Sequence, residues 1–222
     1  MKLYKLTDQD GYTRRNEIGE TQWSAGKTLA LPKKDNPQLC SSDVVHASRN
    51  ANLALLLNPN QANISNPRLW AAIGEVVAYD YGKVGCFELT TVEELSLPAW
   101  FMESNVAYRV RVWFAILCAE AVLSVYEKQY PQDKRVRQAV QAAKDFIDGK
   151  ISAYAAAAAY AAAAAYAADA AADAAVAAAA YAAAAADAAA AAAAAYAAAD
   201  AAADEIDFAA LANQAVKLAL KS

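Results

Sequence analysis

An alanine tract near the C-terminus constrains the fold of this chain more than any other feature. Between Ala153 and Ala203, 41 of 51 residues are alanine, and neither glycine nor proline interrupts the run. Alanine has the highest intrinsic helix propensity, so we expect the tract to be helical. One continuous helix would be about 77 Å long at about 1.5 Å per residue. A compact chain of this size has a radius of gyration of about 17 Å.

The tract can therefore be a projecting rod or a set of helices folded back on one another. A rod would expose methyl groups along its whole length and gain nothing from their burial. Alanine-lined helices can instead approach to about 8 Å, the lower end of interaxial distances. Tyr166, Tyr181 and Tyr196 recur at intervals of 15 residues, each followed by an aspartate, which is typical of short stacked helices. We favour the folded-back arrangement and keep the rod as the alternative.

The N-terminal part differs in its content of glycine and proline. Residues 1–103 contain every glycine except Gly149 and every proline except Pro131, which is typical of short strands and turns. We expect extended segments at residues 1–6, 21–31, 39–48, 66–82 and 83–95. Residues 50–57 form a helix or apolar segment, which the sequence Asn58-Pro59-Asn60 should terminate. This predicts a mixed α/β domain over residues 1–103.

A helical hairpin follows at residues 104–149. Apolar residues recur there at intervals of three and four, the pattern of an amphipathic helix: Ala107, Val110, Phe114, Leu117, Ala121 and Val125. Ser104 is the expected N-cap of the first helix, and Pro131 lies in the loop that ends it. Asp133 should cap the second helix, which runs to Ile147, and Gly149 should stop it.

The predicted fold class is therefore α+β, with an N-terminal mixed α/β domain followed by an all-α, Ala-rich antiparallel helical bundle. The second domain covers residues 104–222. It consists of the hairpin, Ala-rich helices over 151–204 and a C-terminal helix over 205–221.

Charge and cysteine content exclude several classes of protein. The formal net charge is −4, and no segment has the dense lysine and arginine stripe that nucleic-acid binding requires. Cys40, Cys86 and Cys118 are far apart and there is one histidine, so we expect neither a metal site nor a cofactor, and we expect reduced thiols. The N-terminus lacks an apolar leader, and aspartates interrupt the tract at a cost of about 2.5–3.5 kcal/mol each at a bilayer centre. We expect a cytoplasmic protein that does not enter the membrane.

Residues 105–205 resemble the Ala-rich helical immunity proteins of bacterial toxin loci. The resemblance rests on four features in order: Cys118-Ala119-Glu120 in a helix, a loop from Tyr130 to Arg135, an Ala-Ala-Lys helix ending at glycine, and an alanine tract. In that family the tract usually carries arginine, tryptophan or histidine, whereas here it carries tyrosine and aspartate. The resemblance implies a protein that neutralises a protein partner.

The N-terminal part is similar to a small domain of uncharacterised phage and bacterial proteins. The similarity is carried by the sequences YKLTDQDGYT, TQWSAGKT, LCSSDVVHAS and LLLNPNQANISNPRLW. The run from Leu39 to Leu57 also resembles the strand-then-helix unit of the ADP-ribosyltransferase-like fold, which implies a cleft for NAD. A phage-encoded anti-defence inhibitor is compatible with these similarities.

His46 is the one candidate for acid–base or ribose-orienting chemistry. In an N-terminal cleft it could act together with Arg14 and Glu75 on NAD or a signalling nucleotide. The structural alternative is a histidine at a strand end whose ring is satisfied by nearby backbone. No phosphate-binding loop, dinucleotide fingerprint or nucleophile elbow is present in the sequence.

The tyrosines and aspartates of the tract are the candidates for partner binding. Tyrosine combines a large contact area with a polar tip and is enriched at interfaces. The candidate residues are Tyr154, Tyr160, Tyr166, Tyr181, Tyr196, Asp169, Asp173 and Asp187. We therefore expect a non-enzymatic inhibitor of a toxin or host defence protein, leave self-association open, and keep the nucleotide-binding N-terminal domain as the alternative.

Overall fold

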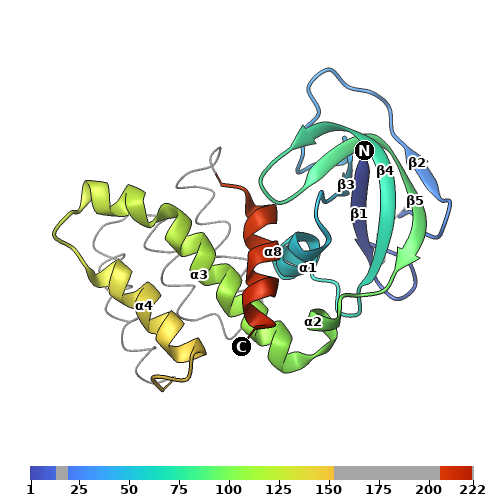
Figure 1. Ribbon diagram of the computed structural model, residues 1–222. Coiled ribbons are helices and arrows are strands. Elements are labelled where there is room, and N and C mark those ends of the chain that lie inside the picture. Colours follow the sequence, from blue (N-terminus) through green and yellow to red (C-terminus); the bar gives the residue numbers. More distant parts are fainter. Residues whose placement is uncertain (14–19, 153–205, 222) are drawn as a thin grey trace. The chain divides into compact units, whose positions relative to one another are not determined.

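The computed structural model describes residues 1–13, 20–152 and 206–221. The chain divides into two compact units, Met1–Pro98 and Ala99–Ser222, which we describe separately. Figure 1 shows the antiparallel strands of the first unit and the helices of the second. No helix among the described residues is long and apolar enough to cross a membrane.

The first unit is built on a five-stranded antiparallel sheet. Its strands are β1 (Lys2–Thr7), β2 (Thr28–Ala30), β3 (Val45–Ala47), β4 (Arg68–Tyr79) and β5 (Val84–Leu95). The order is β1-β4-β5-β2, and β3 pairs with β5 beside β2. The long hairpin of β4 and β5 forms the centre of the sheet (Figure 1).

The sheet curls until its first strand meets β3. Tyr4 and Ser48 exchange two backbone hydrogen bonds of 2.8 Å, which join β1 to the end of β3. The pairings β1–β4, β4–β5 and β5–β3 therefore close into a circuit. Three register shifts between β4 and β5 help this curvature, because bulges bend and twist a strand. The enclosed core consists of Leu3, Trp23, Val45, Ala47, Ala72, Val84, Cys86 and Leu89.

The expected mixed α/β character of this unit is wrong. All strand pairings are antiparallel, and α1 (Ala51–Gln61) is the one helix among the described residues of the unit. The segments around β1, β4 and β5 are strands as expected. The segments at 21–31 and 39–48 form only three-residue strands, since most of each is loop or turn.

Helix α1 also continues further than the sequence predicts. Asn50 caps it by accepting a hydrogen bond of 2.9 Å from the Leu53 amide, and the helix runs through Pro59 to Gln61. Pro59 has no N–H to donate to the carbonyl four residues earlier, so the last turn of the helix lacks one backbone hydrogen bond. The end is instead fixed by the Asn58 carbonyl, which accepts from the amides of Ala62 and Asn63.

The described helices of the second unit are α2 (Ala99–Met102), α3 (Ser104–Gln129), α4 (Arg135–Ile147) and α8 (Phe208–Ala219). Helix α3 contacts the other three and has an almost continuous buried face. Helix α8 packs on α3 through Phe208, Ala212, Ala215 and Ala219, and α4 packs through Val136, Ala139, Val140, Ala143 and Ile147. Small side chains spaced by three and four residues let two helices approach closely.

The loop and stop signals of the hairpin act as expected. The Gly149 amide donates to the Phe146 carbonyl (2.9 Å) and the Lys150 amide donates to the Asp145 carbonyl (2.7 Å). Gly149 has a φ of 72°, so these bonds form a Schellman motif that ends α4. Asp133, expected to cap α4, accepts a hydrogen bond from the Arg135 amide, but the N-cap position is Lys134, which makes no side-chain capping bond. Ser104 is the first helical residue rather than the cap, which is Glu103.

The predicted all-α, Ala-rich antiparallel bundle is also wrong as a description of the C-terminal region. The described helices are arranged around α3, and valine, isoleucine, leucine and aromatic residues make up most of their buried residues. Longer apolar side chains bury more area than alanine and so dominate the packing energy. The Ala-rich segment on which the bundle prediction depended lies at residues 153–205, outside the described residues.

Candidate functional site

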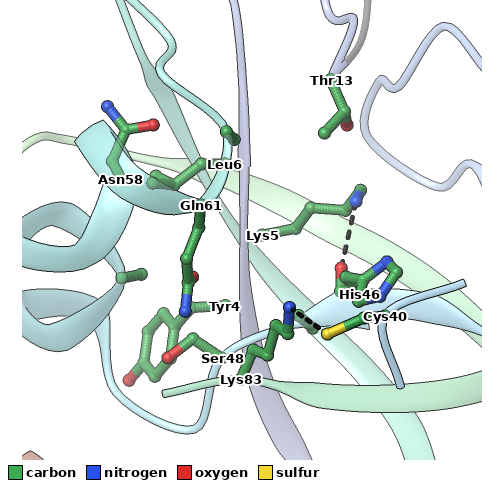
Figure 2. A pocket seen from close by; sticks show the side chains of 13 residues that line it. Tyr4, Lys5, Leu6, Thr13, Cys40, His46, Ser48, Asn58, Gln61 and Lys83 are labelled. Atoms are coloured by element: carbon green, nitrogen blue, oxygen red, sulfur yellow. Dashed lines mark hydrogen bonds between the residues drawn. The ribbon is translucent and has the colours of Figure 1, made fainter. Parts of the chain in front are cut away.

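His46 lines a cavity of about 260 Å³ in the first unit. Residues of β1, β3, α1 and the adjoining loops line it, among them Lys5, Cys40, Gln61 and Lys83 (Figure 2). The His46 ring nitrogen Nε2 contacts the carbonyl oxygen of Leu39. A carbonyl oxygen can only accept, so Nε2 carries a proton. This contact agrees with the interpretation in which nearby backbone satisfies the ring.

Lys5 is the most deeply placed charged side chain of this cavity. It is only 5% exposed, because β1 directs it to the inside of the curled sheet. Its ammonium group donates to the His46 carbonyl oxygen at 3.1 Å and lies 4.8 Å from the centroid of the Trp23 ring. Hydrogen bonding and the cation–π contact offset part of the cost of burying the charge.

A second lysine lies at the cavity beside the exposed thiol. The Lys83 ammonium, just before β5, donates to the Cys40 sulfur at 3.2 Å (Figure 2). The other two cysteines are buried, and burial raises the pKa of the Cys86 thiol and of the Cys118 thiol. A thiol is less nucleophilic than a thiolate, so Cys86 and Cys118 should react slowly. Cys40 is exposed and is therefore the accessible cysteine for chemical modification.

The other members of the proposed nucleotide site are not gathered around His46. Glu75 lies on β4 and lines a different hollow, together with Lys33, Ile73 and Phe87. Arg14 lies outside the described residues. Sequence reasoning missed Lys5 and Lys83 because neither belongs to a motif. Alternation along β1 places Lys5 with Leu3 on the inner face, and this was the available signal.

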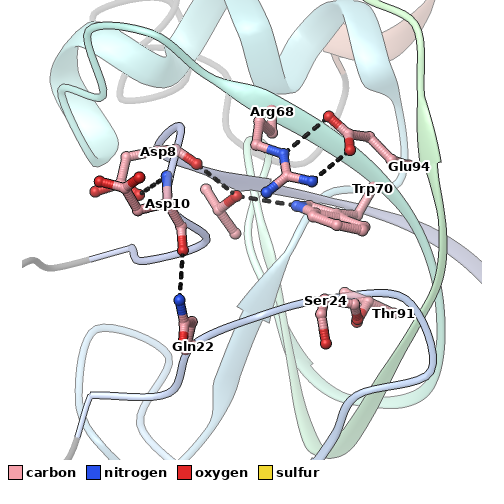
Figure 3. A network of polar contacts seen from close by, with 9 residues as sticks. Asp8, Asp10, Gln22, Ser24, Arg68, Trp70, Thr91 and Glu94 are labelled. Carbon is pink, nitrogen blue, oxygen red and sulfur yellow. Dashed lines mark hydrogen bonds and ion pairs between the residues drawn. The ribbon is translucent and has the colours of Figure 1, made fainter.

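Polar contacts tie the first strand to the central hairpin. Arg68 forms a bidentate ion pair with Glu94, and its guanidinium carbon lies 4.6 Å from the centroid of the Trp70 ring (Figure 3). The ion pair raises the pKa of Arg68 and lowers that of Glu94. The Trp70 indole N–H donates to the Thr7 hydroxyl at 2.9 Å. These contacts stabilise the sheet and do not form a pocket for chemistry.

Ion pairs also cross between α3 and α4. The Nε and Nη2 atoms of Arg137 each lie 2.6 Å from a carboxylate oxygen of Glu127, and Lys144 Nζ lies 2.6 Å from Glu120 Oε1. The arginine lowers the pKa of the Glu127 carboxyl. These pairs are exposed, so each contributes little stability and leaves charged groups on the surface.

The predicted partner-binding residues of the alanine tract, Tyr154, Tyr160, Tyr166, Tyr181, Tyr196, Asp169, Asp173 and Asp187, all lie outside the described residues. Among the residues that the structure does describe, no group of three histidine, cysteine, aspartate or glutamate side chains could hold a metal ion.

Comparison with known proteins identifies the C-terminal region. No curated protein and no solved structure shows significant similarity to the chain. A family model described as "Imm-5 like putative immunity protein" matches residues 107–221, which is more than half of the 222 residues. The match begins within α3 and includes α4 and α8. The chain therefore belongs to the Imm-5-like putative immunity protein family.

Proposed function

We propose that this protein is a non-catalytic inhibitor that binds and neutralises a toxin protein encoded beside it. The observation that carries the proposal is the family match over residues 107–221. An immunity protein acts by stoichiometric binding, so it needs a stable scaffold and an accessible recognition surface rather than a catalytic constellation. The described helices provide such a scaffold, with apolar faces buried around α3 and charged side chains outside.

The charge of the C-terminal segment of the family region indicates the chemistry of the partner surface. Residues 151–222 contain two basic and seven acidic side chains, a net charge of −5. Complementary charge accelerates association and selects the partner. We therefore propose that the tyrosines and aspartates of the tract contact a basic face of the toxin, with the tyrosine rings supplying most of the contact energy.

Co-expression tests the proposal directly. Each protein encoded next to this chain is expressed alone and together with it, and growth and complex formation are measured. We expect one neighbour to be toxic alone, harmless with this chain, and bound to it at a fixed stoichiometry. Failure of the chain both to bind and to protect against every toxic neighbour would contradict the proposal.

Paired tyrosine variants test the role of the tract. Tyr181→Ala combined with Tyr196→Ala should weaken toxin binding at least tenfold, in the range of a lost interface anchor. Tyr79→Ala is the matched control, because Tyr79 is a 69% exposed tyrosine of the first unit. Equal binding by both variants would exclude these two rings as anchors.

A further inference from the structure

We propose that the cavity lined by Lys5 and Lys83 binds a small anion, a phosphate or carboxylate group on a compact molecule. We call it the two-lysine cavity. The proposal concerns the first unit and does not depend on toxin binding, because the family match covers only residues 107–221.

The charged side chains that line the two-lysine cavity favour an anion, while the carboxylates of Glu20 and Asp80 bond to the backbone amides of the lining residues Thr13 and Lys83. Lys5 and Lys83 both line it, and none of the described residues that line it is an aspartate or glutamate. Lys5 approaches from β1 and Lys83 from the turn between β4 and β5, so the two side chains come from separate segments of the first unit (Figure 2). Like charges gathered in a cleft with low-dielectric walls attract a counter-ion more strongly than the same charges on an open surface.

Uncharged groups that can hydrogen bond a ligand line the same space. The Thr13 hydroxyl oxygen is buried and has no hydrogen-bonding partner among the described residues. Buried polar atoms nearly always have a hydrogen-bonding partner. A ligand or water molecule in the cavity would provide that partner for the Thr13 hydroxyl. The Gln61 side-chain amide, from the last residue of α1, also makes no hydrogen bond within the described part of the chain. Both groups can donate to an oxyanion.

Other polar side chains of the cavity are already committed to structure. The Asn58 amide group bonds to both the amide and the carbonyl of Ile64, and the Ser48 hydroxyl bonds to Asn50. The two ammonium groups are also engaged, Lys5 with the His46 carbonyl and Lys83 with the Cys40 sulfur, so they offer an anion their charge and their further N–H donors. At about 260 Å³ the cavity is near the lower limit of ligand pockets, which indicates a ligand smaller than a dinucleotide.

The exposed thiol of Cys40 provides a reporter of anion binding in the full-length protein. Iodoacetate and iodoacetamide alkylate thiols by the same reaction and differ in charge. An anion-attracting cavity should raise the rate with iodoacetate relative to iodoacetamide, compared with the same ratio for glutathione. Because Cys86 and Cys118 are buried, peptide mass mapping assigns the reaction to Cys40.

The variant Lys83→Met separates charge from thiol reactivity. Loss of the Lys83 ammonium group changes the thiolate fraction of Cys40, and this change affects the rates with iodoacetate and iodoacetamide equally. The ratio of the two rates therefore reports only the electrostatic attraction of the iodoacetate anion. We expect the ratio to fall about fivefold, as for one unit charge a few ångströms away. Lys27→Met is the matched control, since Lys27 is exposed in the same unit and does not line the cavity. Lys83→Gln repeats the measurement should the methionine variant aggregate.

Competition identifies the class of ligand. Inorganic phosphate and succinate are added separately during alkylation of the wild-type protein with iodoacetamide. Protection of Cys40 by phosphate alone assigns the site to phosphate-bearing molecules, and protection by succinate alone assigns it to carboxylates. A rate ratio equal to that of glutathione, or no protection by either anion, would overturn the proposal.

Discussion

The hydroxyl of Thr7 lies at the centre of the buried polar contacts between β1 and β4. It accepts from the Trp70 indole N–H at 2.9 Å and donates to the Asp8 carbonyl at 3.1 Å, and Thr7 is fully buried. Thr7→Val keeps the shape but leaves the indole N–H without an acceptor. We expect the free energy of unfolding to fall by about 1–3 kcal/mol, measured by urea denaturation.

Thr28→Val is the matched control for Thr7. The Thr28 hydroxyl bonds to the Thr90 hydroxyl at 2.8 Å on an exposed part of the sheet, where water can replace the lost contact. This variant should change stability by less than about 0.5 kcal/mol. Equal losses in the two variants would show that burial of the indole N–H does not determine the cost.

Asp133 should make the stability of the helical hairpin depend on pH in the acidic range. Its carboxylate accepts from the Arg135 guanidinium group, the Arg135 amide and the Tyr126 hydroxyl, and these contacts, the guanidinium group first, hold its pKa well below the ordinary value of 3.8. A depressed pKa in the folded state contributes stability that is present above pH 3.8 and is lost as the pH falls below it.

We therefore expect Asp133→Asn to lower the free energy of unfolding by about 1 kcal/mol at pH 7, since part of the pair is exposed. The difference from the wild-type protein should shrink at pH 3. Urea denaturation at both pH values measures it, with Asp148→Asn as a control for a more exposed carboxylate. A difference that stays constant with pH would exclude the Asp133 carboxylate as its source.

At the scale of the element, Asn58 fixes both the end of α1 and the loop that follows. Its side-chain amide donates to the Ile64 carbonyl at 2.9 Å and accepts from the Ile64 amide at 3.1 Å, in a site where Asn58 is 7% exposed. Asn58→Ala should lower the free energy of unfolding by about 2–4 kcal/mol, because two backbone groups lose their partners. Thermal and urea denaturation measure the loss.

Asn66 provides the comparison for Asn58. It lies exposed in the same loop, and Asn66→Ala should change stability by less than about 0.5 kcal/mol. If Asn58→Ala were equally mild, the helix end would be held by the backbone bonds of Ala62 and Asn63 alone.

Elements with strong local signals could be predicted from the sequence, and elements that depend on distant contacts could not. The glycine and proline distribution led to the expected strand at residues 1–6, and three- and four-residue spacing predicted helices in the regions of α3 and α4. The continuation of α1 through Pro59 depends on bonds to residues beyond the helix, which no propensity describes.

The same distinction applies to the candidate site. His46 could be found because it is the single histidine, whereas Lys5 on β1 and Lys83 in the turn before β5 are far apart in sequence. Only the closing of β1 onto β3 through Tyr4 and Ser48 brings β1 to the cavity. The antiparallel topology likewise depends on pairing between distant segments, so the expectation of a mixed α/β domain failed.

At the scale of the whole molecule, the two proposed activities belong to different units. The family match lies within Ala99–Ser222, and the two-lysine cavity lies within Met1–Pro98. We expect Lys83→Met to lower the iodoacetate preference of Cys40 and leave protection against the toxin unchanged. Tyr181→Ala with Tyr196→Ala should have the opposite pattern, because substitutions without shared partners act independently. Growth on co-expression tests toxin neutralisation, and alkylation rates test anion binding, both measured on the same variants. Loss of protection in Lys83→Met would mean that anion binding takes part in toxin recognition.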